Sequence, residues 1–172
     1  KTILKEVRKK FKVAQNVEIT IECNPNSTNE EKLLSYKDIG INRLSLGVQS
    51  FNKRSLDFVG RIQNDKNLLQ NYKKETINIL KKAKELGFDN ISVDFILGLP
   101  YQKNWELKKF LKKLCKLVCH FSCYMLILEE KTKLAKLLPN GVSDEKLAKQ
   151  YEIAVQTLAR LDFYRYEISN FA

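Results

Sequence analysis

Short segments in which apolar and polar residues alternate recur along the chain, separated by longer stretches with helical spacing. Residues 17–23, 43–49 and 90–96 place apolar side chains on one face and small or polar ones on the other, the period of two that is typical of strands. Between them, residues 28–39 and 68–86 carry apolar residues three or four positions apart, which predicts helices. Strands that alternate with helices indicate βα units with parallel pairing.

The same patterns predict elements toward both ends of the chain. Residues 1–12 carry Ile3, Leu4, Val7 and Phe11 at helical spacing, which predicts a helix packed on a sheet. Thr28 and Glu31 have the spacing of a capping box, so we expect Thr28 to begin the next helix. Further helices are predicted over residues 53–59, 105–117 and 144–161, and further strands over residues 120–128 and 166–169.

One face of each predicted strand is polar, which is unusual for a parallel sheet covered by helices on both faces. If helices cover the apolar face, the polar face needs water or a ligand. A partial (βα) barrel with a wet lumen meets this requirement, so we predict an α/β fold of that kind. An antiparallel sheet with one solvated face is the alternative, and the helices between the strands count against it. The polar face consists of Thr20, Glu22, Ser45, Gln49, Ser92, Asp94, Ser122 and Tyr124.

Candidate binding residues lie where these strands end. In (βα) barrels, ligands bind at the C-terminal ends of the strands, where Glu22, Gln49 and Asp94 are located. Arg61 follows the second of these strands and adds a planar cation. Carboxylates bind an ammonium or ribose hydroxyls, and a guanidinium binds a carboxylate through two hydrogen bonds. Together the four side chains suit a zwitterion such as an amino-acid moiety, although each residue alone also fits a surface or ion-pair role.

The charge balance changes this picture little. The chain has a net charge of +11, but its lysines are spread along every predicted helix and do not cluster with aromatic residues. This spread favours solvated helix faces, so we expect no nucleic-acid partner. No apolar run approaches the roughly 18 residues that a membrane helix needs, so we expect no membrane span.

Three of the four cysteines, Cys115, Cys119 and Cys123, form a CxxxCxxxC pattern that suggests a metal or iron–sulfur site. Their neighbours are apolar and the spacing matches no common zinc pattern, so we predict core packing for them. His120 is likewise expected to be a strand residue and not a metal ligand. Cysteines that look reduced, together with the lack of a signal-like start, predict a cytoplasmic location.

Six segments together resemble one family. They are IECNP (21–25), INRLSLGVQSF (41–51), VGRIQ (59–63), NISVDFILGLPYQ (90–102), SCYMLILEEKT (122–132) and YEISNFA (166–172). In this order, they resemble radical S-adenosylmethionine (SAM) proteins of the oxygen-independent coproporphyrinogen III oxidase group. The last segment favours the haem chaperone branch of that group over the oxidase branch.

The resemblance implies a partial (βα) barrel of the radical SAM type. It implies that Glu22 contacts SAM and that Gln49, Arg61 and Asp94 line the SAM or substrate cavity. In this family a four-iron four-sulfur cluster binds SAM, which is cleaved to a deoxyadenosyl radical. The chaperone branch binds haem and passes it to acceptor proteins, and this is the function we expect, with haem or a porphyrin and haem-accepting proteins as partners. The alternative is the oxidase, which decarboxylates a porphyrinogen.

The sequence also departs from the family pattern. The cluster motif CxxxCxxC and a glycine-rich SAM segment are expected before residue 1, and a C-terminal domain after residue 172. We therefore expect residues 1–172 to be the central portion of the barrel, truncated at both ends, without a cluster or radical chemistry of its own. Gln63 stands where the chaperone branch usually has a histidine, and Asp162 where a glycine is usual.

Overall fold

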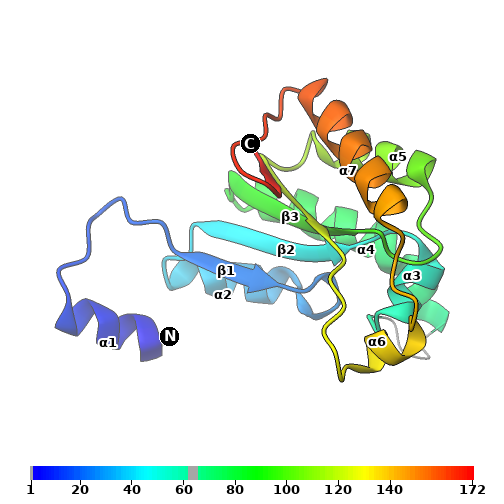
Figure 1. Cartoon of the computed structure of the whole chain (residues 1–172). Helices are drawn as coiled ribbons and strands as arrows, with labels where there is room; N and C mark the ends of the chain where they lie inside the picture. The colour runs from blue at the N-terminus through cyan, green and yellow to red at the C-terminus, as the bar shows by residue number, and fades with distance from the viewer. Residues whose placement is uncertain (1, 62–65) are drawn as a thin grey trace.

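The computed structural model describes residues 2–61 and 66–172, which form an open five-stranded sheet in the order β1-β2-β3-β4-β5 (Figure 1). The first four strands pair in parallel, and β5 runs antiparallel to β4. This sheet confirms the predicted α/β fold with its partial barrel. The strands are β1 (Thr20–Cys23), β2 (Arg43–Gln49), β3 (Asn90–Leu97), β4 (His120–Met125) and β5 (Asn170–Phe171).

Helices connect successive strands and cover the apolar face of the sheet. The β2 residues Leu44, Leu46 and Val48 are at most 2% exposed, and they belong to one core with apolar residues of α2, α4, α5 and α7. None of the helices in the described part of the chain is both long and apolar enough to cross a bilayer. The helices are α1 (Thr2–Lys10), the 3₁₀ turn η1 (Pro25–Ser27), α2 (Glu30–Asp38), α3 (Lys53–Phe58), α4 (Lys66–Glu85), α5 (Asn104–Leu114), α6 (Lys133–Leu137) and α7 (Asp144–Ala159).

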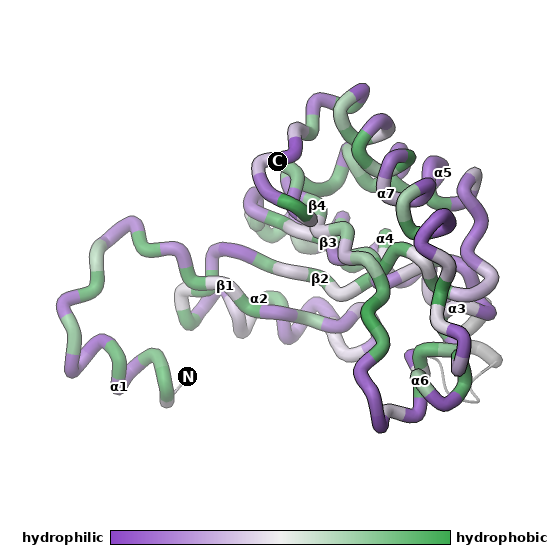
Figure 2. Tube along the Cα trace, viewed as in Figure 1, coloured by the Kyte–Doolittle hydropathy of each residue, from purple (hydrophilic) through white to green (hydrophobic). Residues whose placement is uncertain are grey.

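Helix α1 does not pack on the sheet, and that prediction was wrong. The helix buries none of its residues, and Ile3 and Phe11 expose 78% and 66% of their surface. A long segment without regular structure connects α1 to β1, and the helix stands apart from the sheet (Figure 1). Figure 2 shows that α1 nevertheless carries hydrophobic residues. Helical spacing fixes which side of a helix is apolar, but it does not fix what covers that side.

Strand β1 is shorter than predicted because a side chain replaces its partner strand. Asn42 Oδ1 accepts a hydrogen bond from Ile19 N (2.7 Å), and Asn42 Nδ2 donates one to Val17 O (2.9 Å). The side-chain amide thereby satisfies the backbone groups that a neighbouring strand would otherwise pair. Regular pairing with β2 then begins only at Thr20.

The start of α2 also differs from the prediction. Asn29 is the N-cap, with its side chain accepting a hydrogen bond from Lys32 N (2.9 Å). The Thr28 hydroxyl instead donates to Asn24 O (2.8 Å). Threonine and asparagine are both good N-caps, but the Thr28 hydroxyl is already bound within the turn after β1.

The C-terminal strand lies later than predicted. Residues 166–169 are bends, and β5 is Asn170–Phe171. Tyr164 and Tyr166 pair with Ala172 and Asn170 through backbone hydrogen bonds, so the chain folds back on itself at this edge. Strand β4 ends at Met125 instead of residue 128, and the short helix α6 was not predicted.

Of the two single residues that depart from the family pattern, Asp162 is in the described part of the chain. It adopts φ 63°, the left-handed region that favours glycine, which explains why a glycine is usual at this position. Gln63 lies outside the described residues.

Candidate functional site

Parallel pairing arranges polar side chains in rows across the uncovered face of the sheet. The register pairs Glu22 with Ser45, Ser45 with Ser92, and Ser92 with His120. Paired residues of neighbouring parallel strands point to the same face, so these four side chains form one row. Two residues further along each strand, a second row contains Gly47, Asp94 and Ser122.

Two cavities open along these rows and share one wall. The larger, of about 510 Å³, is lined by Arg43, His120 and Tyr166 among others, and we call it the His120 cavity. The smaller, of about 350 Å³, is lined by Gly47 and Arg61 among others, and we call it the Arg61 cavity. The shared wall consists of Glu22, Ser45, Gln49 and Asp94. Three of the four predicted site residues therefore lie between the cavities, and Arg61 lines the smaller one.

Gln49 and Arg61 come together over Gly47. A Cβ atom at position 47 would lie 2.9 Å from Gln49 Nε2 and 3.4 Å from Arg61 Nη2, so only glycine admits this approach. Gln49 adopts φ 64°, at the point where the register between β2 and β3 shifts. A left-handed non-glycine residue costs about 1–2 kcal/mol, and such strain often accompanies binding sites.

The backbone of Arg61 is fixed from two directions. Arg61 N donates to Leu56 O of α3 (2.9 Å), and Asn26 Nδ2 of η1 donates to Arg61 O (2.9 Å). The turn after β1 and the helix after β2 thus jointly position the guanidinium-bearing residue.

Asp94 is a partly buried carboxylate at the centre of the sheet. Ser45 Oγ lies 3.1 Å from both of its carboxylate oxygens. Burial raises the pKa of the Asp94 carboxyl, hydrogen bonds from Ser122 and Ser45 oppose that rise, and the nearby Glu22 adds to it. A carboxyl group that accepts hydrogen bonds in this position is also suited to bind an ammonium or hydroxyl groups of a ligand.

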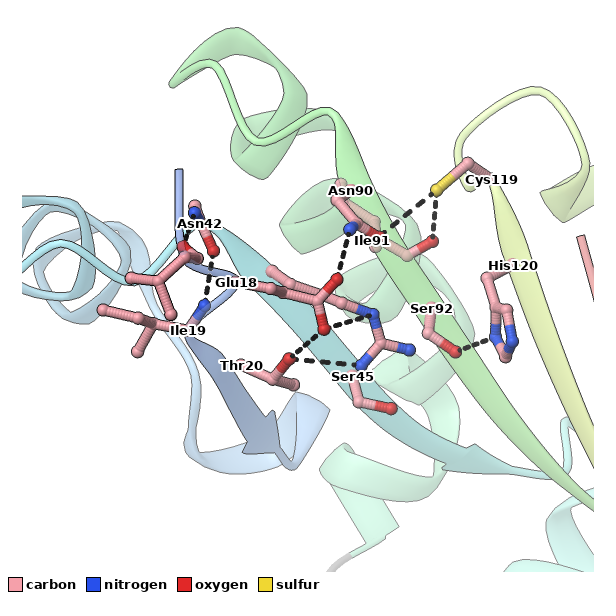
Figure 3. Close-up of polar contacts among 12 residues, drawn as sticks. Glu18, Ile19, Thr20, Asn42, Ser45, Asn90, Ile91, Ser92, Cys119 and His120 are labelled. Carbon is pink, nitrogen blue, oxygen red and sulfur yellow. Dashed lines mark hydrogen bonds and ion pairs between the residues drawn. The ribbon is translucent and has the colours of Figure 1, made fainter. Parts of the chain in front are cut away.

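Paired charges close the N-terminal end of the uncovered face. Glu18 accepts hydrogen bonds from Thr20 Oγ1 (3.1 Å) and Asn90 Nδ2 (3.2 Å), and its Oε1 lies 3.9 Å from Arg43 Nε (Figure 3). Arg43 Nη1 also donates to Thr20 Oγ1 (3.3 Å). Thr20 was predicted to lie on the polar face, and Arg43 was not. Alternation from Ser45 also places Arg43 on that face.

His120 is the main residue that the sequence analysis underrated. It lies in β4, as predicted, but it also lines the larger cavity, and the residue is 9% exposed. Its Nδ1 lies 2.7 Å from Ser92 Oγ, and its Nε2 lies 2.8 Å from Tyr166 Oη. Burial and the nearby Arg43 lower the pKa of His120. The alternation that placed Ser122 on the polar face was the available signal.

The cysteines of the CxxxCxxxC pattern differ in their exposure to solvent. Cys123 is fully buried, which raises the pKa of its thiol to about 12, whereas Cys119 is exposed and Cys115 is half-buried. Core packing was therefore right for Cys123 and wrong for Cys119. Within residues 2–61 and 66–172, no three His, Cys, Asp or Glu residues are placed to hold a metal ion.

Comparison with known proteins gives consistent matches. The family model for the radical SAM superfamily matches residues 1–114. The haem chaperone HemW of Bacillus subtilis is 36% identical over 160 residues, which are 90% of this chain and 40% of that protein. The haem chaperone HemW of Haemophilus influenzae is 33% identical over 171 residues, which are 99% of this chain and 43% of that protein.

A solved structure supports the fold. The coproporphyrinogen III oxidase HemN of Escherichia coli, a radical SAM enzyme, superposes with a TM-score of 0.83 at 24% identity. The match covers 99% of this chain and 38% of that chain. The chain thus spans about 40% of the length of the curated relatives described above.

Proposed function

The chain belongs to the radical SAM superfamily, and on that premise we propose that it is part of a haem chaperone, a protein that binds haem and passes it to acceptor proteins. The observation that carries this proposal is the 33–36% identity to haem chaperones over at least 90% of the chain. The His120 cavity and the Arg61 cavity support this proposal, because a polar sheet face of this kind needs a ligand or water.

We propose that Glu22, Gln49, Arg61 and Asp94 bind SAM. The Arg61 guanidinium would hold the carboxylate of the amino-acid moiety, and Gln49 lies beside it over Gly47. The Glu22 and Asp94 carboxylates would take the ammonium group or the ribose hydroxyls. The donor set fits SAM, and when bound SAM would supply a sulfonium group for the chemistry of the superfamily.

The superfamily also implies an iron–sulfur cluster, and the described cysteines do not fit one. Cys119 is exposed while Cys123 is buried, and cluster ligation requires several thiolates on one centre. We therefore assign no step through a cluster to these residues. Haem-accepting proteins as partners and a cytoplasmic location stay predictions.

Two measurements on the native protein test this function. Titration with haem, followed by Soret absorbance, is expected to saturate at a fixed stoichiometry. Anaerobic incubation with coproporphyrinogen III is expected to yield no decarboxylated product. Decarboxylation without saturable haem binding would overturn the chaperone proposal in favour of the oxidase.

A further inference from the structure

Three side chains form a hydrogen-bonded chain that leads from inside the sheet to the His120 cavity. Ser92 of β3 contacts His120 Nδ1 at 2.7 Å (Figure 3), and His120 Nε2 contacts the Tyr166 hydroxyl at 2.8 Å. Tyr166 precedes β5 and reaches across from the folded-back C-terminal segment. The role of this chain of contacts depends on the direction in which each proton points.

The burial of Ser92 sets the first proton. Ser92 is 0% exposed, and His120 is the one hydrogen-bond partner of its hydroxyl among the residues that the structure describes. If Nδ1 carried the imidazole proton, the Ser92 O–H would be left buried without an acceptor, at a cost of about 1–3 kcal/mol. Ser92 therefore donates to Nδ1, and the imidazole proton resides on Nε2.

The protonation of His120 determines the direction of its hydrogen bond to Tyr166. Burial and Arg43 lower its pKa, whereas Glu167 and Glu18 oppose that change. A neutral imidazole with its proton on Nε2 donates to Tyr166 Oη. The Tyr166 oxygen then serves as an acceptor toward His120, and its own proton is directed elsewhere.

We propose that Tyr166 donates its hydroxyl proton into the His120 cavity and, together with Arg43, forms a binding subsite for a carboxylate. Tyr166 is 64% exposed and lines this cavity with Arg43. Among the described residues, the polar contacts of Arg43 engage Nε and Nη1, and a guanidinium has further donors on Nη2. A phenol and a guanidinium together match the two oxygens of a carboxylate.

Two ligands of the proposed function carry such a group: haem in its propionates, and SAM in its amino-acid moiety, whose carboxylate the proposed function places on Arg61. A propionate of haem is therefore the ligand that we expect at this subsite. The identity of the ligand therefore rests on the proposed function, whereas the proton placement does not. Ser92 and His120 act as positioning residues, because the role proposed for them is to direct the hydroxyl proton of Tyr166.

The proton placement is tested directly by ¹⁵N NMR of the imidazole. The 172 residues contain a single histidine, so the side-chain spectrum of the chain needs no assignment. We expect a protonated Nε2 and an unprotonated Nδ1 at neutral pH. A protonated Nδ1, or a doubly protonated ring, would overturn the proposal. In Ser92→Ala the preference for one tautomer is expected to weaken.

The subsite is tested by affinity for three probes: haem, haem dimethyl ester and SAM. Tyr166→Phe is expected to weaken one carboxylate ligand by roughly 10- to 100-fold, the usual range for a hydrogen bond to a charged group. Tyr164→Phe is the matched control, because Tyr164 is equally exposed but does not line the cavity, and it is expected to change nothing.

The probes separate the two sources. A loss for haem that is absent for its dimethyl ester identifies a propionate. A loss for SAM alone identifies the amino-acid carboxylate and would overturn the assignment of that carboxylate to Arg61. Equal affinities of the wild-type chain and Tyr166→Phe for all three probes would refute the subsite while leaving the proposed function intact. Failure of the wild-type chain to bind any probe would instead overturn the proposed function, and with it this ligand assignment.

Ser92→Ala distinguishes a positioning role of Ser92, which acts through Tyr166, from a role in fold stability alone. It is expected to weaken the same ligand by a smaller factor than Tyr166→Phe, because it frees the imidazole to accept the Tyr166 proton. In a Tyr166→Phe background Ser92→Ala is expected to add nothing to the loss. Additive losses in the double variant would contradict the proposed chain of donors.

Discussion

The side chain of Gln49 folds back over Gly47, so closely that a Cβ atom at position 47 would lie 2.9 Å from Gln49 Nε2. The same atom would lie 3.4 Å from Arg61 Nη2. The absence of a side chain at position 47 thus leaves room for both the amide and the guanidinium that we propose for SAM binding. The residue also pairs with Asp94 in the next strand, so it lies at the centre of the candidate site.

Gly47→Ala is expected to weaken SAM binding by about tenfold or more, because the new methyl group must displace Gln49 and Arg61. The free energy of unfolding is expected to change by less than about 1 kcal/mol, since both neighbours are ends of side chains that can move. Calorimetric titration with SAM and denaturant unfolding measure the two effects. Unchanged SAM affinity would show that this arrangement is not needed for the ligand.

Asp94→Asn is expected to stabilise the fold at neutral pH. Burial raises the pKa of Asp94 in the folded state, so its ionisation costs stability as pH rises from the ordinary value of about 3.9 through the raised folded one. The benefit of the substitution should be small near pH 4 and reach its full size above the folded pKa. Denaturant unfolding of both proteins between pH 4 and 8 tests this. A difference in the free energy of unfolding between Asp94→Asn and the wild type that shrinks or reverses as pH rises would contradict the prediction. SAM affinity should fall in the same variant.

Gly98→Ala is expected to destabilise the protein by about 2–5 kcal/mol, from backbone strain and overpacking together. Gly98 has φ 86°, and an added Cβ would lie 2.3 Å from Leu147 Cδ2 of α7. Gly141→Ala is the matched control, because it has φ 67° with nothing within 4 Å, and should cost only about 1–2 kcal/mol. Equal losses of stability for Gly98→Ala and Gly141→Ala in thermal unfolding would show that Leu147 of α7 does not pack closely against Gly98.

Phe11→Ser, next to α1, is expected to change the free energy of unfolding by less than about 0.5 kcal/mol, because Phe11 is 66% exposed. Leu33→Ala in α2 is the contrasting change, since Leu33 is 0% exposed, and should cost about 2–5 kcal/mol. Chemical denaturation of both variants makes the comparison. A large loss of unfolding free energy for Phe11→Ser would mean that the apolar side of α1 is covered in solution.

Alternation was sufficient to predict the polar face of the sheet, because the period of a strand fixes which side chains share a face. Ser45, Asp94 and Ser122 were placed correctly for that reason. The contact between His120 and Tyr166 was not predictable, because it depends on how the C-terminal segment folds back after α7. The start of β1 was missed for a similar reason, since Asn42 pairs with the backbone through its side chain.

We propose that the uncovered face of the sheet binds a ligand through Glu22, Gln49, Arg61 and Asp94. The most direct measurement is the affinity for SAM of the wild-type chain, Arg61→Ala and Arg54→Ala. Arg54 is the matched control, because it lies in α3 over the ring of Tyr101 and lines neither cavity. We predict a loss of at least about tenfold for Arg61→Ala and none for Arg54→Ala. Equal affinities of all three proteins for SAM, or no binding by the wild-type chain, would contradict the account.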